Sequence, residues 1–296
     1  MIFVTGATGT VGREVVKLLL DQDVPVRALT RDPAKAKIDP RVAVIAGDTS
    51  NPQTFAKSLR GVDALFTVVF GPNMAAEEAQ LASVAKEAGV KHIVKLSALG
   101  AGANSANGAN GPREGIAAMH VSAEQALAAS GVAWTLVQPT AFMSNVMFQR
   151  EPIVRAGKIF SNYDDGKIPY VHPRDIAAVA VEALTSPAKH EGKAYPVTGG
   201  EALGVADLAR MLGDAIGRAI EYVPVTDEAT AQTFRSHGMH EVIVGALLPF
   251  GAIVRSGRAA EVLPTVRNVL GREPLTFADW AREHASAFQA QPVHAA

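Results

Sequence analysis

The residues with the clearest chemical potential are three glycines near the start of the chain. Gly6, Gly9 and Gly12 are spaced G-x-x-G-x-x-G between an apolar run, residues 1–5, and a helix-like segment, residues 13–20. This order predicts a strand, a tight turn and a helix. Backbone N–H groups and the positive end of the helix dipole meet in such a turn and suit a pyrophosphate. We therefore expect a dinucleotide here; the alternative is a glycine-rich turn without a ligand.

Glycine is required in this turn because a Cβ would hold the phosphates away from the backbone, or the helix away from the strand. A glycine triplet alone is weak evidence, but the flanking strand and helix supply the context that the motif needs. The residues expected to bind the pyrophosphate are those of the turn: Gly6, Thr8, Gly9, Thr10, Val11 and Gly12.

The end of the second predicted strand bears on the choice of cofactor. An acidic residue about 20 residues beyond the glycines binds the ribose 2′-hydroxyl of NAD, whereas an arginine accommodates the 2′-phosphate of NADP. The chain places Thr30 and Arg31 first, with Lys35 close behind, and this favours NADP(H) with Arg31 on the phosphate or the adenine. Asp32 leaves NAD open, although this residue is also suited to capping the turn at Pro33.

Other candidates follow the third and fourth predicted strands. Asp48 could accept a hydrogen bond from the adenine amino group, or it could cap the helix that follows. Phe70 and Gly71 should run beside the adenine-side ribose towards the nicotinamide, where a glycine lets the backbone approach closely.

The fifth predicted strand and the next helix carry the candidates for proton transfer. Ser97 lies where short-chain dehydrogenases have a serine, but the helix predicted next, residues 116–130, carries no Tyr-x-x-x-Lys. His120 and Glu124 share a helical face, and His120 could donate a proton near neutral pH. The alternative for His120 is a residue that shapes the pocket or hydrogen-bonds the ribose. Glu124 is better suited to a solvated or structural role.

The sixth predicted strand leads into a segment expected to border the nicotinamide. Pro139, Thr140 and Phe142 are the candidates there, with Phe142 as an apolar wall or as a core residue. A glycine- and asparagine-rich loop at 100–115 is either a mobile flap beside the cofactor or an ordinary surface loop.

Further polar residues in the second half suggest structural roles. Asp175 is placed to anchor the start of a helix, and His172 to face the cleft. His237 and His240 have helical metal-ligand spacing, but without a third ligand we expect a surface pair and no metal site.

Composition excludes several classes of protein. The 296 residues are 48% hydrophobic and 19% charged, which supports a sizeable core rather than disorder. A net charge of −1 without a basic run argues against nucleic-acid binding. The absence of cysteine excludes disulfides and thiolate catalysis. No secretion signal or membrane-spanning stretch is apparent, so we expect a cytoplasmic protein.

Apolar runs alternate with helical segments in the first half of the chain. The predicted strands are residues 1–5, 24–30, 42–46, 63–70, 91–97 and 132–138, and the predicted helices are 13–20, 51–60, 75–88 and 116–130. Such alternation predicts right-handed βαβ units and an α/β fold, a Rossmann-type doubly wound parallel sheet. Ligands of such sheets bind at the carboxyl ends of the strands.

The alternation loosens after Pro139. Helices are expected at 173–185 and 205–216, strands at 193–198 and 220–225, and a helical pattern at 226–288, with Thr276 capping the last helix. We therefore expect an NADP-binding Rossmann domain at 1–150 and a smaller, mostly helical C-terminal substrate lobe at 151–296, with 173–198 returning to the Rossmann core.

With these features the chain resembles the NmrA-like group of atypical short-chain dehydrogenases, which includes NAD(P)H:quinone oxidoreductases and triphenylmethane-dye reductases. The similar stretches are 4–12, 30–31, 47–48, 120–124, 130–135, 139–145, 174–177 and 269–277. The resemblance implies NADPH binding, no tyrosine–lysine pair, and either reduction of flat conjugated acceptors or no catalysis. The chain departs from the group at 100–115 and at Phe142-Met143, and both departures bear on the acceptor.

Together these observations predict an NADPH-dependent reductase that passes hydride to a planar apolar acceptor such as a quinone, with the proton from His120 or solvent. One alternative is a non-catalytic NADP(H)-binding redox sensor of NmrA type with a protein partner. Another is a ketoreductase acting on a biosynthetic intermediate, which would need a firmer proton donor. The apolar segment 242–254 is a core, dimer-interface or partner surface, and a homodimer is left open.

Overall fold

The computed structural model describes residues 1–100 and 115–289, which form two compact units. Unit 1 comprises residues 1–139, 173–197 and 265–272, and unit 2 comprises the rest. The boundary therefore lies at Pro139, earlier than the expected residue 150, and unit 1 takes in residues 265–272 in addition to 173–197.

Unit 1 is built on a seven-stranded sheet in which every pair of neighbouring strands is parallel. The strands are β1 (Ile2–Val4), β2 (Val26–Thr30), β3 (Ala43–Ala46), β4 (Ala64–Thr67), β5 (His92–Leu96), β6 (Ala133–Pro139) and β8 (Lys193–Val197). Their order is β3-β2-β1-β4-β5-β6-β8, so the direction of winding reverses between β1 and β4. This is the doubly wound Rossmann arrangement, and the predicted fold class is confirmed.

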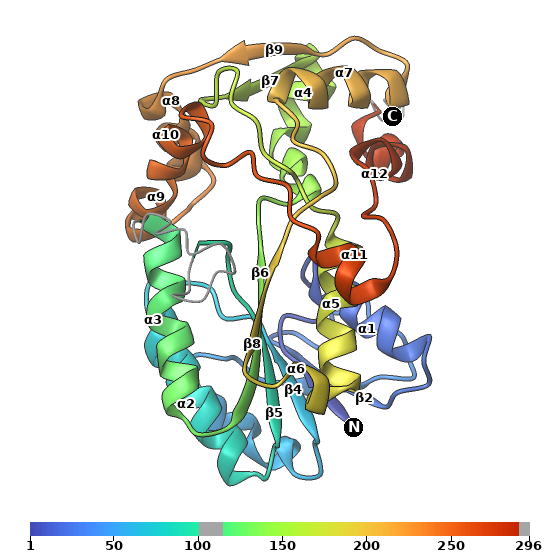
Figure 1. Ribbon diagram of the computed structural model, residues 1–296, viewed down its shortest axis with the longest axis vertical. Helices are drawn as coiled ribbons and strands as arrows, with labels where there is room; N and C mark the ends of the chain where they lie inside the picture. The colour runs from blue at the N-terminus through green and yellow to red at the C-terminus, as the bar shows by residue number, and fades with distance from the viewer. Residues whose placement is uncertain (101–114, 290–296) are drawn as a thin grey trace. The chain divides into compact units, whose positions relative to one another are not determined.

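Helices cover both faces of this sheet. The long ones are α1 (Gly12–Leu20), α2 (Met74–Glu87), α3 (Gly115–Ala129) and α5 (Pro173–Thr185); the short ones are the 3-10 helix η1 (Pro52–Leu59), α6 (Pro187–His190) and α11 (Thr265–Leu270). Helices α2 and α3 lie together on one face, and α1 and α5 lie together on the other (Figure 1). Because both faces are covered, β1 and β4 are buried along their full length, as expected of apolar parallel strands.

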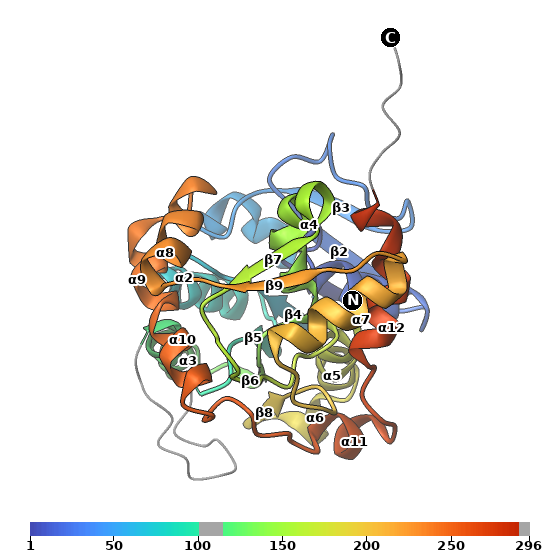
Figure 2. The same cartoon turned by 90° about the horizontal axis from the view of Figure 1, so that it is seen from above.

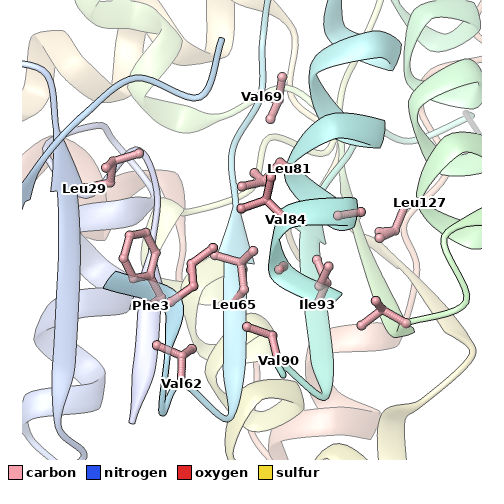
Figure 3. Close-up of a cluster of buried hydrophobic side chains, with 14 of the residues drawn as sticks. Phe3, Leu29, Val62, Leu65, Val69, Leu81, Val84, Val90, Ile93 and Leu127 are labelled. Carbon is pink, nitrogen blue, oxygen red and sulfur yellow. The ribbon is translucent and has the colours of Figure 1, made fainter. Parts of the chain in front are cut away.

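The α2/α3 face of the sheet holds an apolar cluster (Figure 3). Leu65, Ile93 and Leu136 come from three neighbouring strands and pack with residues of α2 and α3. Since strand side chains alternate between faces, the residues two positions further on share this face. These residues are Thr67, Lys95 and Gln138, so the apolar cluster gives way to polar side chains towards the carboxyl ends of the strands.

Unit 2 combines a small two-stranded sheet with helices. Its elements are the 3-10 helix η2 (Met143–Gln149), α4 (Arg150–Ala156), β7 (Lys158–Ser161), α7 (Val205–Ile216), β9 (Glu221–Pro224), α8 (Asp227–Ser236), α9 (Glu241–Leu247), α10 (Pro249–Arg255), α12 (Phe277–His284) and the 3-10 helix η3 (Ala285–Phe288). Strands β7 and β9 lie side by side in parallel (Figure 2). Trp280 stacks between Phe277 and His284 and, together with Phe288, anchors the core of this unit.

Most predicted elements lie within a few residues of their observed positions, and the departures have local causes. The segment at 51–60 is a 3-10 helix, and its N-cap Asn51 makes no side-chain capping bond. The region 226–288 is divided into separate helices, with Gly238, Gly257 and Gly271 in the left-handed conformation between them. Thr276 caps α12 as expected, its hydroxyl accepting from the Asp279 N–H at 3.1 Å.

Candidate functional site

The glycine turn between β1 and α1 brings two backbone segments into direct contact. Gly6 adopts a φ of +60°, and its carbonyl oxygen accepts a hydrogen bond from Gly9 N at 2.9 Å. A Cβ on Gly12 would lie 2.1 Å from that same oxygen, so only glycine lets the helix begin here. The Thr5 hydroxyl ties the turn to the segment after β4 by accepting from Val68 N at 2.7 Å.

The outer part of the turn is open to solvent at the positive end of α1. Thr8, Gly9 and Thr10 are exposed. Arg13 turns back from the first turn of α1 and donates to the carbonyl oxygens of Thr8 and Gly9, each at 3.2 Å. The turn is thus held in shape while its outer surface carries no bulky side chain, and it fits a dinucleotide pyrophosphate. Val11 is buried and starts the helix beneath this surface.

The two charged residues that follow β2, Arg31 and Asp32, have different surroundings. Asp32 Oδ1 accepts from the N–H groups of Ala34 and Lys35, and its other oxygen pairs with Lys35 Nζ at 3.1 Å. Asp32 therefore closes a turn, the second of the two roles left open by the sequence. Arg31 is exposed, and within residues 1–100 and 115–289 its side chain makes no hydrogen bond or ion pair. This guanidinium is available to pair with a phosphate group of a ligand.

Asp48 follows β3, and the charge of Arg31 acts on its carboxyl group. Its Oδ1 accepts from Ser50 N at 3.0 Å. That backbone bond and, more weakly, the Arg31 charge hold the pKa of Asp48 below its usual range. Asp48 is thus ionised and is already used in a turn; its contact with adenine remains a prediction.

The remaining cofactor candidates are divided between the two units. Phe70, 57% exposed, and Gly71 follow β4 in unit 1, where Ser97 and Pro139 occupy the ends of β5 and β6. Thr140 and Phe142 belong to unit 2, where Phe142 pairs with Val171 in a short parallel bridge. The expected flap at 100–115 falls, apart from its end residues, outside the described part of the chain.

Seven buried polar residues extend the apolar cluster of unit 1 on the α2/α3 face. We call them the polar layer: Thr67, Glu78, Lys95, Ser97, His120, Glu124 and Gln138. At its centre Lys95 Nζ pairs with Glu78 Oε2 at 2.7 Å, and both side chains are fully buried. The Thr67 hydroxyl donates to the other Glu78 oxygen at 2.9 Å. Strands β4 and β5 are thereby tied to α2.

Glu124 is the second acidic group of the polar layer. Its Oε1 accepts from the Ser97 hydroxyl and from Gln138 Nε2, the latter at 2.8 Å. Burial raises the pKa of Glu124, against the opposing effect of these two hydrogen bonds and of Lys95. Of the two roles expected for Glu124, the solvated one is wrong, because α3 turns this residue towards the sheet, and the structural one agrees with its hydrogen bonds.

His120 lies one helical turn before Glu124 and is also buried. Burial, reinforced by the Lys95 charge, lowers the pKa of His120 to about 3. The imidazole is therefore neutral at physiological pH, which contradicts its expected action as a charged acid near neutrality. A catalytic or pocket-shaping role for the neutral ring remains a prediction.

Sequence reasoning missed Thr67, Glu78, Lys95 and Gln138. A signal was present: Lys95 directly follows the apolar residues Ile93 and Val94 in a predicted inner strand, where a charge is rarely buried unless it is paired. Its partner could not be read from the sequence, because Glu78 is 17 residues away on a different element.

Other polar residues serve structure. Asp175 is buried and pairs with Arg272 at 2.6 Å, which joins α5 to the end of α11 within unit 1. His240 caps α9 by accepting from Val242 N. Among residues 1–100 and 115–289, no group of three or more histidines and carboxylates could hold a metal ion, and no helix is long and apolar enough to cross a membrane.

Comparison with known families identifies the class of cofactor. Residues 6–187, well over half of the chain, match the model of a family described as NAD(P)H-binding. The chain belongs to this NAD(P)H-binding family. The predicted nicotinamide cofactor is confirmed, as is the resemblance from which it was inferred.

Individual relatives of the NAD(P)H-binding family cover nearly the whole chain. An NAD(P)H azoreductase of Xenophilus azovorans is 41% identical, over 98% of this chain and 100% of that protein. A (4-alkanoyl-5-oxo-2,5-dihydrofuran-3-yl)methyl phosphate reductase of Streptomyces griseus is 38% identical, over 97% and 99%. Escherichia coli quinone oxidoreductase QOR2, solved with NADPH, is 27% identical with a TM-score of 0.80 over 96% and 99%. The chain is an NAD(P)H-dependent oxidoreductase.

The contact between Gly12 and Gly6 yields a first prediction. In Gly12→Ala the new Cβ must displace the Gly6 carbonyl, so the NADPH dissociation constant should rise about 10- to 100-fold, the equivalent of 1–3 kcal/mol of overpacking. Fluorescence titration with NADPH measures the change. Gly204→Ala is the control, because its Cβ would meet no atom nearer than 3.7 Å, and its affinity should match the wild type. Equal affinity in both variants would show that the glycine turn at residues 6–12, which we call the glycine cradle, does not bind the cofactor.

A second prediction concerns acid stability. Between the ordinary pKa of 6.5 and the folded value of about 3, the unfolded chain binds a proton at His120 that the folded chain does not. Stability present above pH 6.5 is therefore lost as the pH falls towards 3. In His120→Asn the unfolding free energy should fall less steeply in this window, by up to about 1.4 kcal/mol per pH unit.

Urea unfolding at a series of pH values measures this slope. The exposed His237 provides the control, since His237→Asn should follow the wild-type slope. A wild-type slope in His120→Asn would show that His120 is not held neutral.

Proposed function

We propose that the protein is an NADPH-dependent reductase of planar conjugated acceptors, with azo compounds and quinones as the substrate classes. The observation that carries this proposal is the glycine cradle, open on its outer side and followed by Arg31, which has no partner among residues 1–100 and 115–289, in a chain 41% identical to an NAD(P)H azoreductase. Reduction of a quinone is supported more weakly, by the 27% identity to QOR2.

The chain's own residues define what the site contributes. When bound, NADPH supplies the hydride. The glycine turn binds the pyrophosphate through backbone N–H groups, and Arg31 binds the 2′-phosphate. Phe70, Ser97 and Pro139, at the ends of β4, β5 and β6, border the region where a doubly wound sheet binds the reactive end of its ligand. Positioning of the two reactants supplies much of the rate.

The nature of the acceptor follows from what the helix after β5 lacks. This helix, α3, has no Tyr-x-x-x-Lys in its described residues; that spacing occurs at Tyr163 and Lys167, in the turn after β7 of unit 2. The histidine of the polar layer, His120, is neutral. Conjugated acceptors take hydride readily because the charge spreads over the whole system, so they depend less on a strong acid than an isolated ketone does. We therefore place azo and quinone acceptors ahead of simple ketones. Cytoplasmic location and a homodimer remain predictions.

The experiment is NADPH oxidation with a panel of azo dyes, quinones and simple ketones. We expect turnover with azo dyes or quinones and little with ketones. Tight NADPH binding without turnover of any acceptor would overturn the enzyme assignment and would favour a cofactor-sensing regulator.

Cofactor choice gives a separate prediction. In Arg31→Ala, kcat/KM with NADPH should fall about 10- to 100-fold, because a charge-assisted hydrogen bond is worth roughly 1.5–3 kcal/mol, whereas the value with NADH should not change. Arg41→Ala is the matched control: it lies on the same connection between β2 and β3, but it pairs with Asp39 at 2.9 Å. An unchanged preference for NADPH in Arg31→Ala would refute the role of Arg31.

A further inference from the structure

The function proposed above gives Glu124 and Gln138 no role, although both lie beside Ser97. Ser97 directly follows β5, and its backbone N donates to Val137 O at 2.7 Å, which fixes the residue at the end of the sheet. Its hydroxyl meets Glu124 Oε1, and Gln138 Nε2 meets the same oxygen at 2.8 Å. Three elements, β5, β6 and α3, thus converge on one carboxyl oxygen.

The charges around Glu124 favour a carboxyl group that holds a proton. The charge of Lys95 acts on Glu124, but Lys95 is paired with Glu78 at 2.7 Å. His120, one turn earlier on α3, is neutral. Within the described residues Glu124 itself forms no ion pair, and a buried carboxylate without a paired cation is costly. Burial accordingly raises its pKa.

Reduction of an azo or quinone acceptor consumes a proton as well as a hydride. A serine hydroxyl alone is too weak an acid to supply this proton. It can do so when a neighbouring acid gives the serine a second proton at the same time, because no free alkoxide then forms. The contact between Ser97 Oγ and Glu124 Oε1 allows this exchange. When Glu124 is protonated it donates to Ser97, and the serine O–H is then available to the acceptor.

We propose that Ser97 donates the proton in this reduction. Glu124 is a positioning residue that acts through Ser97, because it returns a proton to the serine hydroxyl. The inference rests on the proposed function. The Ser97 O–H bond breaks as an O–H or N–H bond forms on the acceptor, and the Glu124 O–H bond breaks as the serine hydroxyl is restored. Glu124 is left as a carboxylate, which takes a proton from solvent before the next turnover. Gln138 orients the carboxyl group.

Two acceptors with different proton requirements test this step. An azo dye needs both hydride and proton, whereas a cationic triphenylmethane dye is neutralised by hydride alone. In Ser97→Ala and Glu124→Gln, kcat with the azo dye should fall about 100-fold, within the usual range of general acid catalysis. The loss should be about 100-fold greater with the azo dye than with the cationic dye, because only the azo dye needs the proton, and the Tm should stay near the wild-type value.

The controls are Ser122→Ala and Glu87→Gln, an exposed serine on α3 and an exposed glutamate on α2. Both should behave as wild type with either dye. Equal losses on the two dyes in Ser97→Ala and Glu124→Gln would show a structural role, and no loss on either would place the proton path elsewhere; both results overturn the inference. A wild type that reduces neither dye overturns the proposed function itself.

Two measurements on the wild type do not depend on the folding of a variant. Azo reduction should slow in D2O more than reduction of the cationic dye, because only the former moves a solvent-derived proton. The kcat for the azo dye should also fall on the alkaline side as Glu124 loses its proton. Equal solvent isotope effects for the two dyes, or a kcat that does not fall with rising pH, would contradict the relay.

Discussion

The ion pair between Lys95 and Glu78 lies where the apolar cluster of unit 1 gives way to the polar layer. Both side chains are fully buried, so their desolvation must be offset by the 2.7 Å contact and by the hydroxyl of Thr67. Because Glu78 matches the charge of Lys95, the lysine supplies no direct counter-ion to Glu124. Burial and, more weakly, the Lys95 charge still oppose protonation of His120. The protonation states of this region depend on that pair.

The cofactor cradle depends on a different constraint, the close approach of α1 to the end of β1. Gly12 has room only for a hydrogen where another residue would carry its Cβ, and Arg13 holds the outer carbonyl groups from the same helical turn. Backbone shape, rather than charged side chains, therefore makes the pyrophosphate site. This explains how a chain of almost no net charge can be suited to a highly anionic cofactor.

The sequence was informative wherever function depends on neighbouring residues. Glycine spacing identified the cradle, and the order of Thr30, Arg31 and Asp32 identified the candidate for the 2′-phosphate. It was less informative where function depends on which helix face meets which strand. The buried state of Glu124 and the neutral state of His120 both follow from the packing of α3 against β5 and β6, which periodicity alone does not reveal.

The same reasoning applies to the fold. The parallel sheet was predictable because apolar runs alternate with helical segments along the first half of the chain. Strand β7 was not, because four residues gain their strand character only by pairing with β9, which begins 60 residues later in the chain. Short strands that depend on such distant partners carry little local signal.

The central claim is that the cradle holds NADPH in one fixed orientation for direct hydride transfer. The most direct test uses NADPH deuterated at either the pro-R or the pro-S position of nicotinamide C4, followed by mass analysis of the NADP⁺ formed with an azo or quinone acceptor. A fixed orientation predicts that the product keeps the deuterium from one isomer and loses it from the other. Partial loss from both isomers would contradict the account.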